Sequence, residues 1–244
     1  MIAPVLPGFG KSRALARRTF DLEDYAEWCG DLLQTLDVDG PVVVLGESMG
    51  GALAVMLGAR EPKVAHSLAL FNSAGGYLPG RNRIDWMLGV ARLSLPRKGA
   101  LGQWISSIAD ALLVLRRPRT AWRLAGLVVN ADLRPVLERL ANLAVPVVAV
   151  FSRRDPVVLA ASGAAFRDEL NIETLFVEGD HRSFLEGHPA IELIVENLLE
   201  SACKGEPLEH DPARRIGNEL RERTGLSLSV EPTGRETAGP ESGS

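Results

Sequence analysis

The stretch PVVVLGESMGGALAV (Pro41–Val55) decides the expected fold. Its uncharged, β-branched beginning is typical of a buried parallel strand, and its small apolar end is expected to be helical over residues 50–59. Between them lies GESMG (residues 46–50), whose glycines permit a strained turn that exposes the hydroxyl of Ser48. The alternative is a glycine-rich turn with an incidental serine, which the flanking strand and helix disfavour. We therefore expect Ser48 to be a nucleophile, with the helix N-terminal amides facing a developing oxyanion.

Apolar runs of strand length alternate with stretches of helical periodicity along the chain. This pattern predicts the α/β class, with a mostly parallel sheet covered by flanking helices. Further strands are expected at Val64–Asn72, Val145–Ser152 and Ile172–Gly179. Further helices are expected at Asp21–Leu36, with Asp21 as its cap, and at Gly163–Leu170 and Pro189–Ser201.

The domain organisation follows from one long insertion and one polar tail. Residues 1–74 and 136–202 are predicted to form the core. Residues 75–135 are too long for a simple crossover and carry apolar residues at helical spacing, so they are predicted to form a helical lid. Residues 203–244 are rich in Pro, Gly, Glu, Arg and Ser and are expected to be mostly disordered; only Ala213–Thr224 could form a helix.

A serine nucleophile needs a base, and the chain offers four histidines. His66 lies inside a predicted strand, and His210 lies in the polar tail. His181 directly follows the last predicted strand, at the sheet edge where Ser48 also emerges. His188 precedes a proline at the start of the closing helix, where a capping role suits it better. We therefore expect His181 to be the base.

The base needs an acid to orient it, and Asp155 lies just past the carboxyl end of the third predicted strand. Asp180 is adjacent to His181, and neighbouring residues on a turn seldom point at one another. Asp132 is a weaker candidate on the return from the insertion. An ordinary turn aspartate before proline is the other interpretation of Asp155. Because Ser48, Asp155 and His181 are all expected at one sheet edge, Asp155 is the predicted acid.

Several segments in this order resemble the α/β-hydrolase superfamily, especially its lid-bearing esterases and lipase-like members. They are LPGFGKS (Leu6–Ser12), LEDYAEW, VVVLGESMGGALAV, LFNSAGG, RRDPVV and EGDHRSFLEGHPA. The resemblance runs from Met1 to about Ser201. It implies Ser48 as nucleophile, Asp155 as acid, His181 as base and the backbone N–H of Met49 as one oxyanion donor. Gly46, Glu47 and Gly50 complete the nucleophile elbow. A serine nucleophile disfavours the haloalkane dehalogenase and epoxide hydrolase branches, which use aspartate.

The chain departs from the family pattern in two places. Glu47 stands where the family often has His, and its carboxylate is expected to contact the lid or solvent. At the start, IAPVLPGFG resembles the family's fourth strand, so two antiparallel strands, a third strand and a loop with the second oxyanion donor are expected upstream. We expect the natural protein to begin earlier, or this form to be truncated and impaired. The strand at Met1–Pro4 would then have no neighbour, and PVVVL would have a bare edge.

Composition excludes several classes of partner. The net charge is −4, no long basic run occurs and aromatic residues make up 5%, so nucleic acid is not expected as a partner. The N-terminus lacks the order of a signal peptide, and no apolar run could span a bilayer, so a cytoplasmic protein without stable membrane insertion is expected. Cys29 and Cys203 show no metal-binding spacing and are expected to be reduced, and no metal or cofactor is predicted.

These features predict a serine hydrolase that cleaves a carboxylic ester with an apolar acyl or alkyl part through an acyl-enzyme. A small-molecule apolar ester is the expected substrate and the only partner that the sequence predicts. Carbon–carbon bond hydrolases and acyltransferases use the same triad, so both remain open. A non-catalytic or impaired relative that acts as a binding protein is the alternative outside enzymes. The sequence predicts neither the exact substrate nor the oligomeric state.

Overall fold

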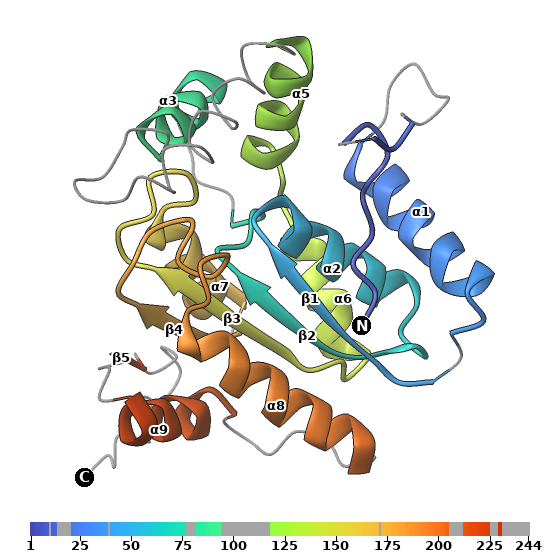
Figure 1. Ribbon diagram of the computed structural model, residues 1–244, viewed down its shortest axis with the longest axis vertical. Coiled ribbons are helices and arrows are strands. Elements are labelled where there is room, and N and C mark those ends of the chain that lie inside the picture. Colours follow the sequence, from blue (N-terminus) through green and yellow to red (C-terminus); the bar gives the residue numbers. More distant parts are fainter. Residues whose placement is uncertain are drawn as a thin grey trace, which may run out of the picture.

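The computed structural model describes residues 1–9, 11–13, 21–38, 40–76, 82–93, 118–170, 172–204, 212–224 and 229–230. Its centre is a five-stranded sheet in the order β1-β2-β3-β4-β5 (Figure 1). The strands are β1 (Val42–Glu47), β2 (Ala65–Phe71), β3 (Val147–Ser152), β4 (Glu173–Val177) and β5 (Ser229–Val230). The first four run parallel, and β5 pairs antiparallel with β4. The predicted class, α/β with a mostly parallel sheet, is confirmed.

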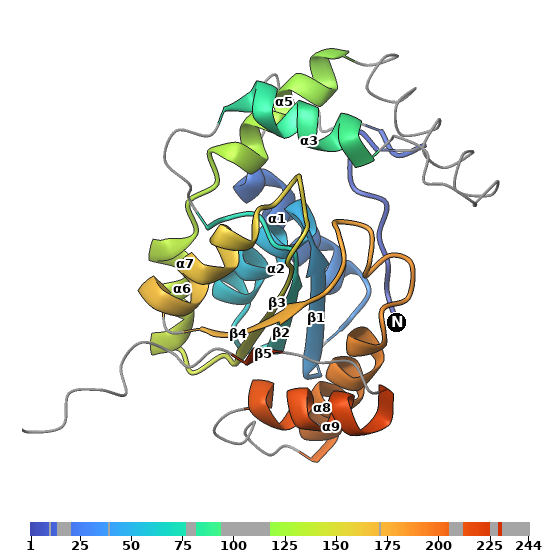
Figure 2. The ribbon, with the colours of Figure 1, turned by 90° about the vertical axis from the view of Figure 1, so that its left-hand side faces the viewer.

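Helices cover both faces of the sheet. One face packs against α1 (Leu22–Thr35), α2 (Met49–Arg60), α6 (Arg134–Asn142) and α7 (Ala160–Leu170). The other face packs against α8 (Pro189–Lys204) and α9 (Pro212–Thr224), which lie side by side (Figures 1 and 2). Asp21 caps α1 through a capping box with Asp24, as its sequence position predicts.

The sheet is apolar on both faces because strand side chains alternate between them. Leu68 and Leu70 of β2 enter the cluster under α1 and α2, whereas Ala69 and Phe71 enter the cluster under α8 and α9. All four side chains are buried. This two-sided burial explains why the predicted strands are continuous apolar runs instead of alternating ones.

The first strand, β1, lies at the edge of the sheet. Among the described residues β1 pairs only with β2, and Leu45 of β1 is 43% exposed. Residues 1–4 adopt no strand structure. The strand that the resemblance implies at Met1–Pro4 is therefore not formed.

The long insertion contributes α3 (Arg83–Leu93) and α5 (Pro118–Val129), which pack against each other beyond the main body of the sheet (Figures 1 and 2). Residues 77–81 and 94–117, including the apolar residues Trp104, Ile105, Ile108, Leu112, Leu113 and Leu115, lie outside the described residues. Helix α6 begins where the insertion was expected to end, and the apolar pattern alone did not predict it.

Part of the polar tail folds against the core. The helix that the sequence allows at Ala213–Thr224 is present as α9, and its Ile216 and Leu220 are fully buried against α8 and the sheet. The two-residue strand β5 was not predicted. Residues 205–211, 225–228 and 231–244 lie outside the described part. In the described ranges, no helix combines the length and apolar character needed to cross a bilayer.

Candidate active site

Ser48 occupies a strained turn between β1 and α2. Its backbone has φ 55° and ψ −119°, a left-handed conformation that non-glycine residues rarely adopt and that costs about 1–3 kcal/mol. The turn is held by the Ser48 N–H, which donates to the Phe71 carbonyl at 3.0 Å, and by the Ala74 N–H, which donates to the Ser48 carbonyl at 3.0 Å. The chain therefore fixes this serine at the carboxyl edge of the sheet.

Close backbone approach explains two of the glycines around the turn. A Cβ at Gly46 would collide with the Gly50 carbonyl, and one at Gly51 would collide with the Ser73 side chain. A Cβ at Gly50 itself would meet nothing within 4 Å. Positions 46 and 51 therefore need glycine for steric reasons. The sequence pattern suggests the same need at Gly50, but a side chain there would meet no close neighbour. Met49 begins α2, so its N–H is among the first-turn amides that have no partner within the helix.

Asp155 and His181 form a close pair. The His181 Nδ1 lies 2.6 Å from Asp155 Oδ2, and the Asp155 side chain is fully buried. The other carboxylate oxygen, Oδ1, accepts the N–H groups of Val157 at 2.7 Å and Val158 at 2.9 Å. Three hydrogen bonds therefore fix the carboxylate, and the carboxylate in turn fixes the imidazole ring. The other ring nitrogen of His181, Nε2, takes no part in the bond to Asp155.

The other predicted candidates are engaged elsewhere. His188 Nδ1 accepts the Ala190 N–H at 3.1 Å at the start of α8, and burial lowers the pKa of His188. His66 lies 3.4 Å from the Ser201 hydroxyl. His210 is outside the described residues. His188 thus takes the capping position that the sequence favours for it.

The alternative acids also have other partners. Asp132 pairs with Arg134, and this pairing lowers the pKa of the Asp132 carboxyl. The Asp180 carboxylate accepts the Arg182 N–H at 3.0 Å. Asp155 is the carboxylate that the structure pairs with His181.

Ser48 follows β1, Asp155 follows β3 and His181 follows β4, so all three lie at the carboxyl ends of parallel strands. Among the described residues no hydrogen bond joins the Ser48 hydroxyl to His181. Bonds between nucleophile and base are often long without substrate and shorten in the reactive complex. The structure thus brings two of the three predicted residues into contact and puts the third at the same edge.

Glu47 was expected to contact the lid or solvent, and the structure buries most of its carboxyl away from solvent. Its Oε1 is inaccessible to solvent and has no hydrogen-bond partner. Burial raises the pKa of Glu47 to about 7, while attraction to His181 lowers it and repulsion from Asp155 raises it. The end of β1 therefore lies within electrostatic range of the Asp155–His181 pair.

Asn72, which sequence reasoning did not single out, ties two strand ends together. Its Oδ1 accepts the Ser152 N–H at 2.7 Å, and its Nδ2 donates to the Ser152 hydroxyl at 3.2 Å. Asn72 is fully buried and has φ 43°, which asparagine tolerates better than most residues. The signal in the sequence was a polar residue directly after an apolar strand.

We predict that Asn72→Ala destabilises the protein by about 2–4 kcal/mol, because a buried N–H loses its acceptor and alanine is strained at positive φ. Urea unfolding measures the loss. Asn72→Gly removes the backbone strain but not the lost hydrogen bonds, so it should be less destabilised than Asn72→Ala. Unchanged stability in both variants would contradict this role.

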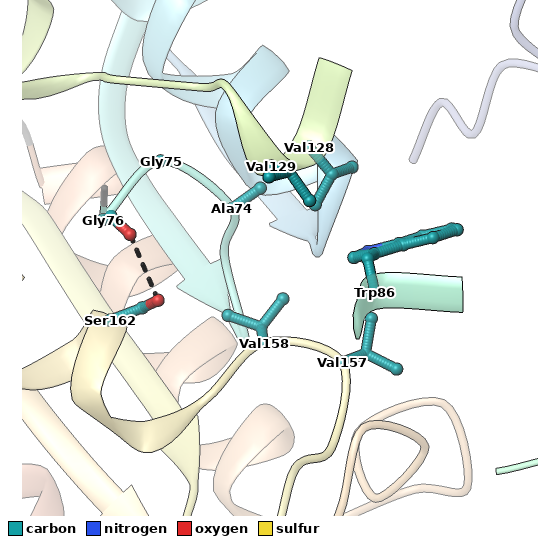
Figure 3. Close-up of a pocket in the computed structure, with 9 residues that line it drawn as sticks. All are labelled: Ala74, Gly75, Gly76, Trp86, Val128, Val129, Val157, Val158 and Ser162. Atoms are coloured by element: carbon teal, nitrogen blue, oxygen red, sulfur yellow. Dashed lines mark hydrogen bonds between the residues drawn. The ribbon is translucent and has the colours of Figure 1, made fainter. Parts of the chain in front are cut away.

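A small hollow of about 20 Å³ lies next to Ala74, whose N–H binds the Ser48 carbonyl (Figure 3). Its lining comes from the loop after β2, from α3 and α5, from the segment after β3 and from the first turn of α7. The residues are Ala74, Gly75, Gly76, Trp86, Val128, Val129, Val157, Val158 and Ser162. Most are apolar. No group of His, Cys, Asp or Glu side chains in the described ranges has the arrangement of a metal site.

Residues 1–194 match the model of the Alpha/beta hydrolase family, and the chain belongs to this family. It is 45% identical over 62 residues to the magnesium-chelatase 30 kDa subunit of Rhodobacter capsulatus. This aligned stretch covers 25% of this chain and 22% of that protein. It is 36% identical over 80 residues to Lipase 1 of Psychrobacter immobilis, which covers 33% of this chain and 25% of that one. The matches span a quarter or less of these curated relatives.

Solved structures with the same fold include enzymes of several kinds. A thermophilic esterase aligns with a TM-score of 0.60 and 20% identity over 81% of this chain and 79% of its own. A putative lipase from Acinetobacter baumannii aligns with a TM-score of 0.60 and 18% identity. The alignment covers 80% of this chain and 73% of the lipase chain. A meta-cleavage product hydrolase from Pseudomonas fluorescens aligns with a TM-score of 0.58 and 15% identity. The alignment covers 81% of this chain and 78% of the hydrolase chain. These likenesses establish the fold.

Proposed function

We propose that the protein is a serine hydrolase that cleaves carboxylic esters with an apolar acyl or alkyl part. The observation that carries the proposal is the buried Asp155 carboxylate bound to His181, at the same sheet edge as the strained turn that bears Ser48. A buried acid, an oriented imidazole and a serine hydroxyl are the three components of nucleophilic acyl transfer.

In the proposed reaction, Ser48 Oγ attacks the ester carbonyl carbon while His181 Nε2 takes the hydroxyl proton. Asp155 holds the ring through Nδ1 and stabilises the imidazolium. The Met49 N–H donates to the oxyanion of the tetrahedral intermediate. His181 then gives its proton to the departing alcohol, and the acyl group remains on Ser48. Water, deprotonated by His181, releases the acid and regenerates the serine.

The lining of the hollow next to Ala74 supports an apolar substrate. The Ala74 N–H binds the Ser48 carbonyl, and Val157 and Val158 bind Asp155, so three lining residues contact catalytic residues directly. We propose that the apolar acyl or alkyl part lies along these residues, and that α3 and α5 belong to a lid over them. A small ester is then the partner, and neither nucleic acid nor the bilayer interior is required.

A fluorophosphonate probe tests the activated serine directly. We expect the wild-type protein to be labelled covalently and Ser48→Ala, with an unchanged circular dichroism spectrum, to remain unlabelled. Ser73→Ala is a suitable control, because Ser73 is buried and its hydroxyl donates to the Ala74 carbonyl. Absence of labelling in well-folded wild-type protein would contradict the proposal.

One comparison favours a second candidate, a non-hydrolytic binding protein. The stretch shared with the magnesium-chelatase 30 kDa subunit shows that a similar sequence occurs in a protein named for a different process. The same probe separates the two candidates, since a binding protein without an activated serine does not react.

A further inference from the structure

Glu47 is a buried acidic residue that the proposed reaction does not use. Its Oε1 has no accessible surface, and no group in the described part of the chain forms a hydrogen bond to it. A buried carboxyl oxygen without a partner is costly, whereas an apolar side chain would avoid that cost. Such a cost at a position one residue before Ser48 is typical of a functional site.

The Glu47 side chain lies on the sheet face that also carries the loop of the predicted base. Side chains alternate along β1, and Val43 packs against the cluster under α8 and α9, so Glu47 belongs to that face as well. Its neighbour in the register of β2 is Phe71, whose ring centroid lies 4.9 Å from that of Phe184. Phe184 follows His181 in the turn between β4 and α8. The acid is therefore packed near the segment that bears the base.

The charges that act on Glu47 are those of the Asp155–His181 pair. Attraction to His181 favours the ionised form of Glu47, whereas repulsion from Asp155 disfavours it. Electrostatic coupling is reciprocal, so the charge of Glu47 also acts on the imidazole ring.

The other ionisable groups around β1 are less well placed to do this. The strand packs against β2, α2 and α8. His66 of β2 and Arg60 of α2 lie at the ends of their elements far from Glu47, and the charged side chains of α8 are exposed. The turn after β4 carries three more ionisable residues beyond His181, namely Arg182, Glu186 and His188.

We propose that Glu47 is a positioning residue whose carboxylate acts together with that of Asp155 to stabilise the imidazolium that His181 becomes during the reaction. This inference rests on the proposed ester hydrolysis. When Ser48 Oγ gives its proton to His181 Nε2, the ring gains a positive charge. Asp155 holds the ring by a hydrogen bond, whereas Glu47 acts through its charge alone. Because the charge on the ring appears only as the reaction proceeds, this attraction lowers the barrier.

The test compares the pH profiles of kcat/KM for one p-nitrophenyl ester in the wild type and in Glu47→Gln. Since the pKa of Glu47 is about 7, its carboxyl is protonated at pH 5.5, where glutamine matches it in shape and charge. The two proteins should then agree within about twofold. Above pH 8 the wild type carries the additional carboxylate, and its kcat/KM should exceed that of the variant by about tenfold.

Glu178→Gln is the matched control. Glu178 directly follows β4, and its side chain is exposed and paired with Arg154. The ratio of wild type to this variant should stay the same across the pH range, because an exposed pair contributes little.

Stability separates this role from a merely structural one. Ionising a buried carboxyl destabilises the fold, so Glu47→Gln should lose activity relative to the wild type at the same pH where it gains relative stability. Urea unfolding at both pH values measures the second quantity. A parallel loss of activity and stability would indicate a damaged fold and overturn the proposal.

NMR titration of the His181 ring gives a second test that needs no turnover, with His181→Gln to assign the signals. In the wild type the ring signals should respond to two steps, the ionisation of His181 and that of Glu47, and in Glu47→Gln to one. If the fluorophosphonate probe labels Ser48, a ratio of kcat/KM that does not change with pH, or a single step in the wild type, overturns the role of Glu47 and leaves the hydrolase standing. If folded protein is not labelled, the hydrolase proposal fails, and the role of Glu47 fails with it.

Discussion

Replacing Asp155 by Asn should lower kcat for ester hydrolysis by about 10³–10⁴-fold while leaving the fold intact. The carboxylate accepts the His181 Nδ1–H and so keeps Nε2 available as a base. An amide at this position can present its N–H to Nδ1, which favours the wrong tautomer. It also removes the negative charge that stabilises the imidazolium when Ser48 loses its proton.

Steady-state kinetics on the variant measures this loss, with circular dichroism and urea unfolding as checks on folding. Asp132→Asn is the matched control, because Asp132 is an exposed carboxylate paired with Arg134. We expect its kcat to stay within about twofold of wild type, since exposed pairs contribute little. Equal losses in the two variants would show that the pairing of Asp155 with His181 has no special role.

The second large effect concerns stability and pH, and it depends on Glu47. Burial raises the pKa of Glu47 from an ordinary 4.5 to about 7 in the folded protein. Below about pH 4.5 the carboxyl is protonated in both the folded and the unfolded chain, and its contribution to stability is fully present. As the pH rises to about 7 the unfolded chain loses the proton first. The contribution is then lost, at a cost of up to roughly 3 kcal/mol.

Glu47→Gln should remove this pH dependence. Between pH 5 and pH 8 the free energy of unfolding of the wild type should fall relative to that of Glu47→Gln, so the variant gains relative stability at the higher pH. Urea unfolding at both values gives the double difference, in which the other titrating groups cancel. Glu138→Gln, on the exposed face of α6, should show no such difference. A Glu47→Gln curve parallel to that of the wild type would contradict a buried carboxyl.

Sequence reasoning predicted the parts of the site that local patterns encode. The strand and helix around GESMG required a strained turn at Ser48, and the Ser48 backbone has φ 55°. Asp155 and His181 could be placed at one edge because parallel strands align their carboxyl ends. The contact between them, at 2.6 Å, agrees with that placement.

The features that sequence reasoning missed depend on contacts between distant segments. The burial of Glu47 depends on the packing around the end of β1, which no local pattern reveals. In the sequence Asn72 looks like an ordinary loop residue, because its hydrogen bonds to Ser152 of β3 form only when the two strands pair. The strand β5 is two residues long, and it is recognisable only through its pairing with β4.

The central claim, that Ser48 forms an acyl-enzyme, is tested most directly by trapping that intermediate. The protein is mixed with a p-nitrophenyl ester, quenched in acid within the first turnover and digested for mass spectrometry. We predict that the acyl mass appears on the peptide that contains Ser48 and is absent in Ser48→Ala. Rapid ester hydrolysis with no adduct at Ser48, or with the acyl group on another residue, would contradict it.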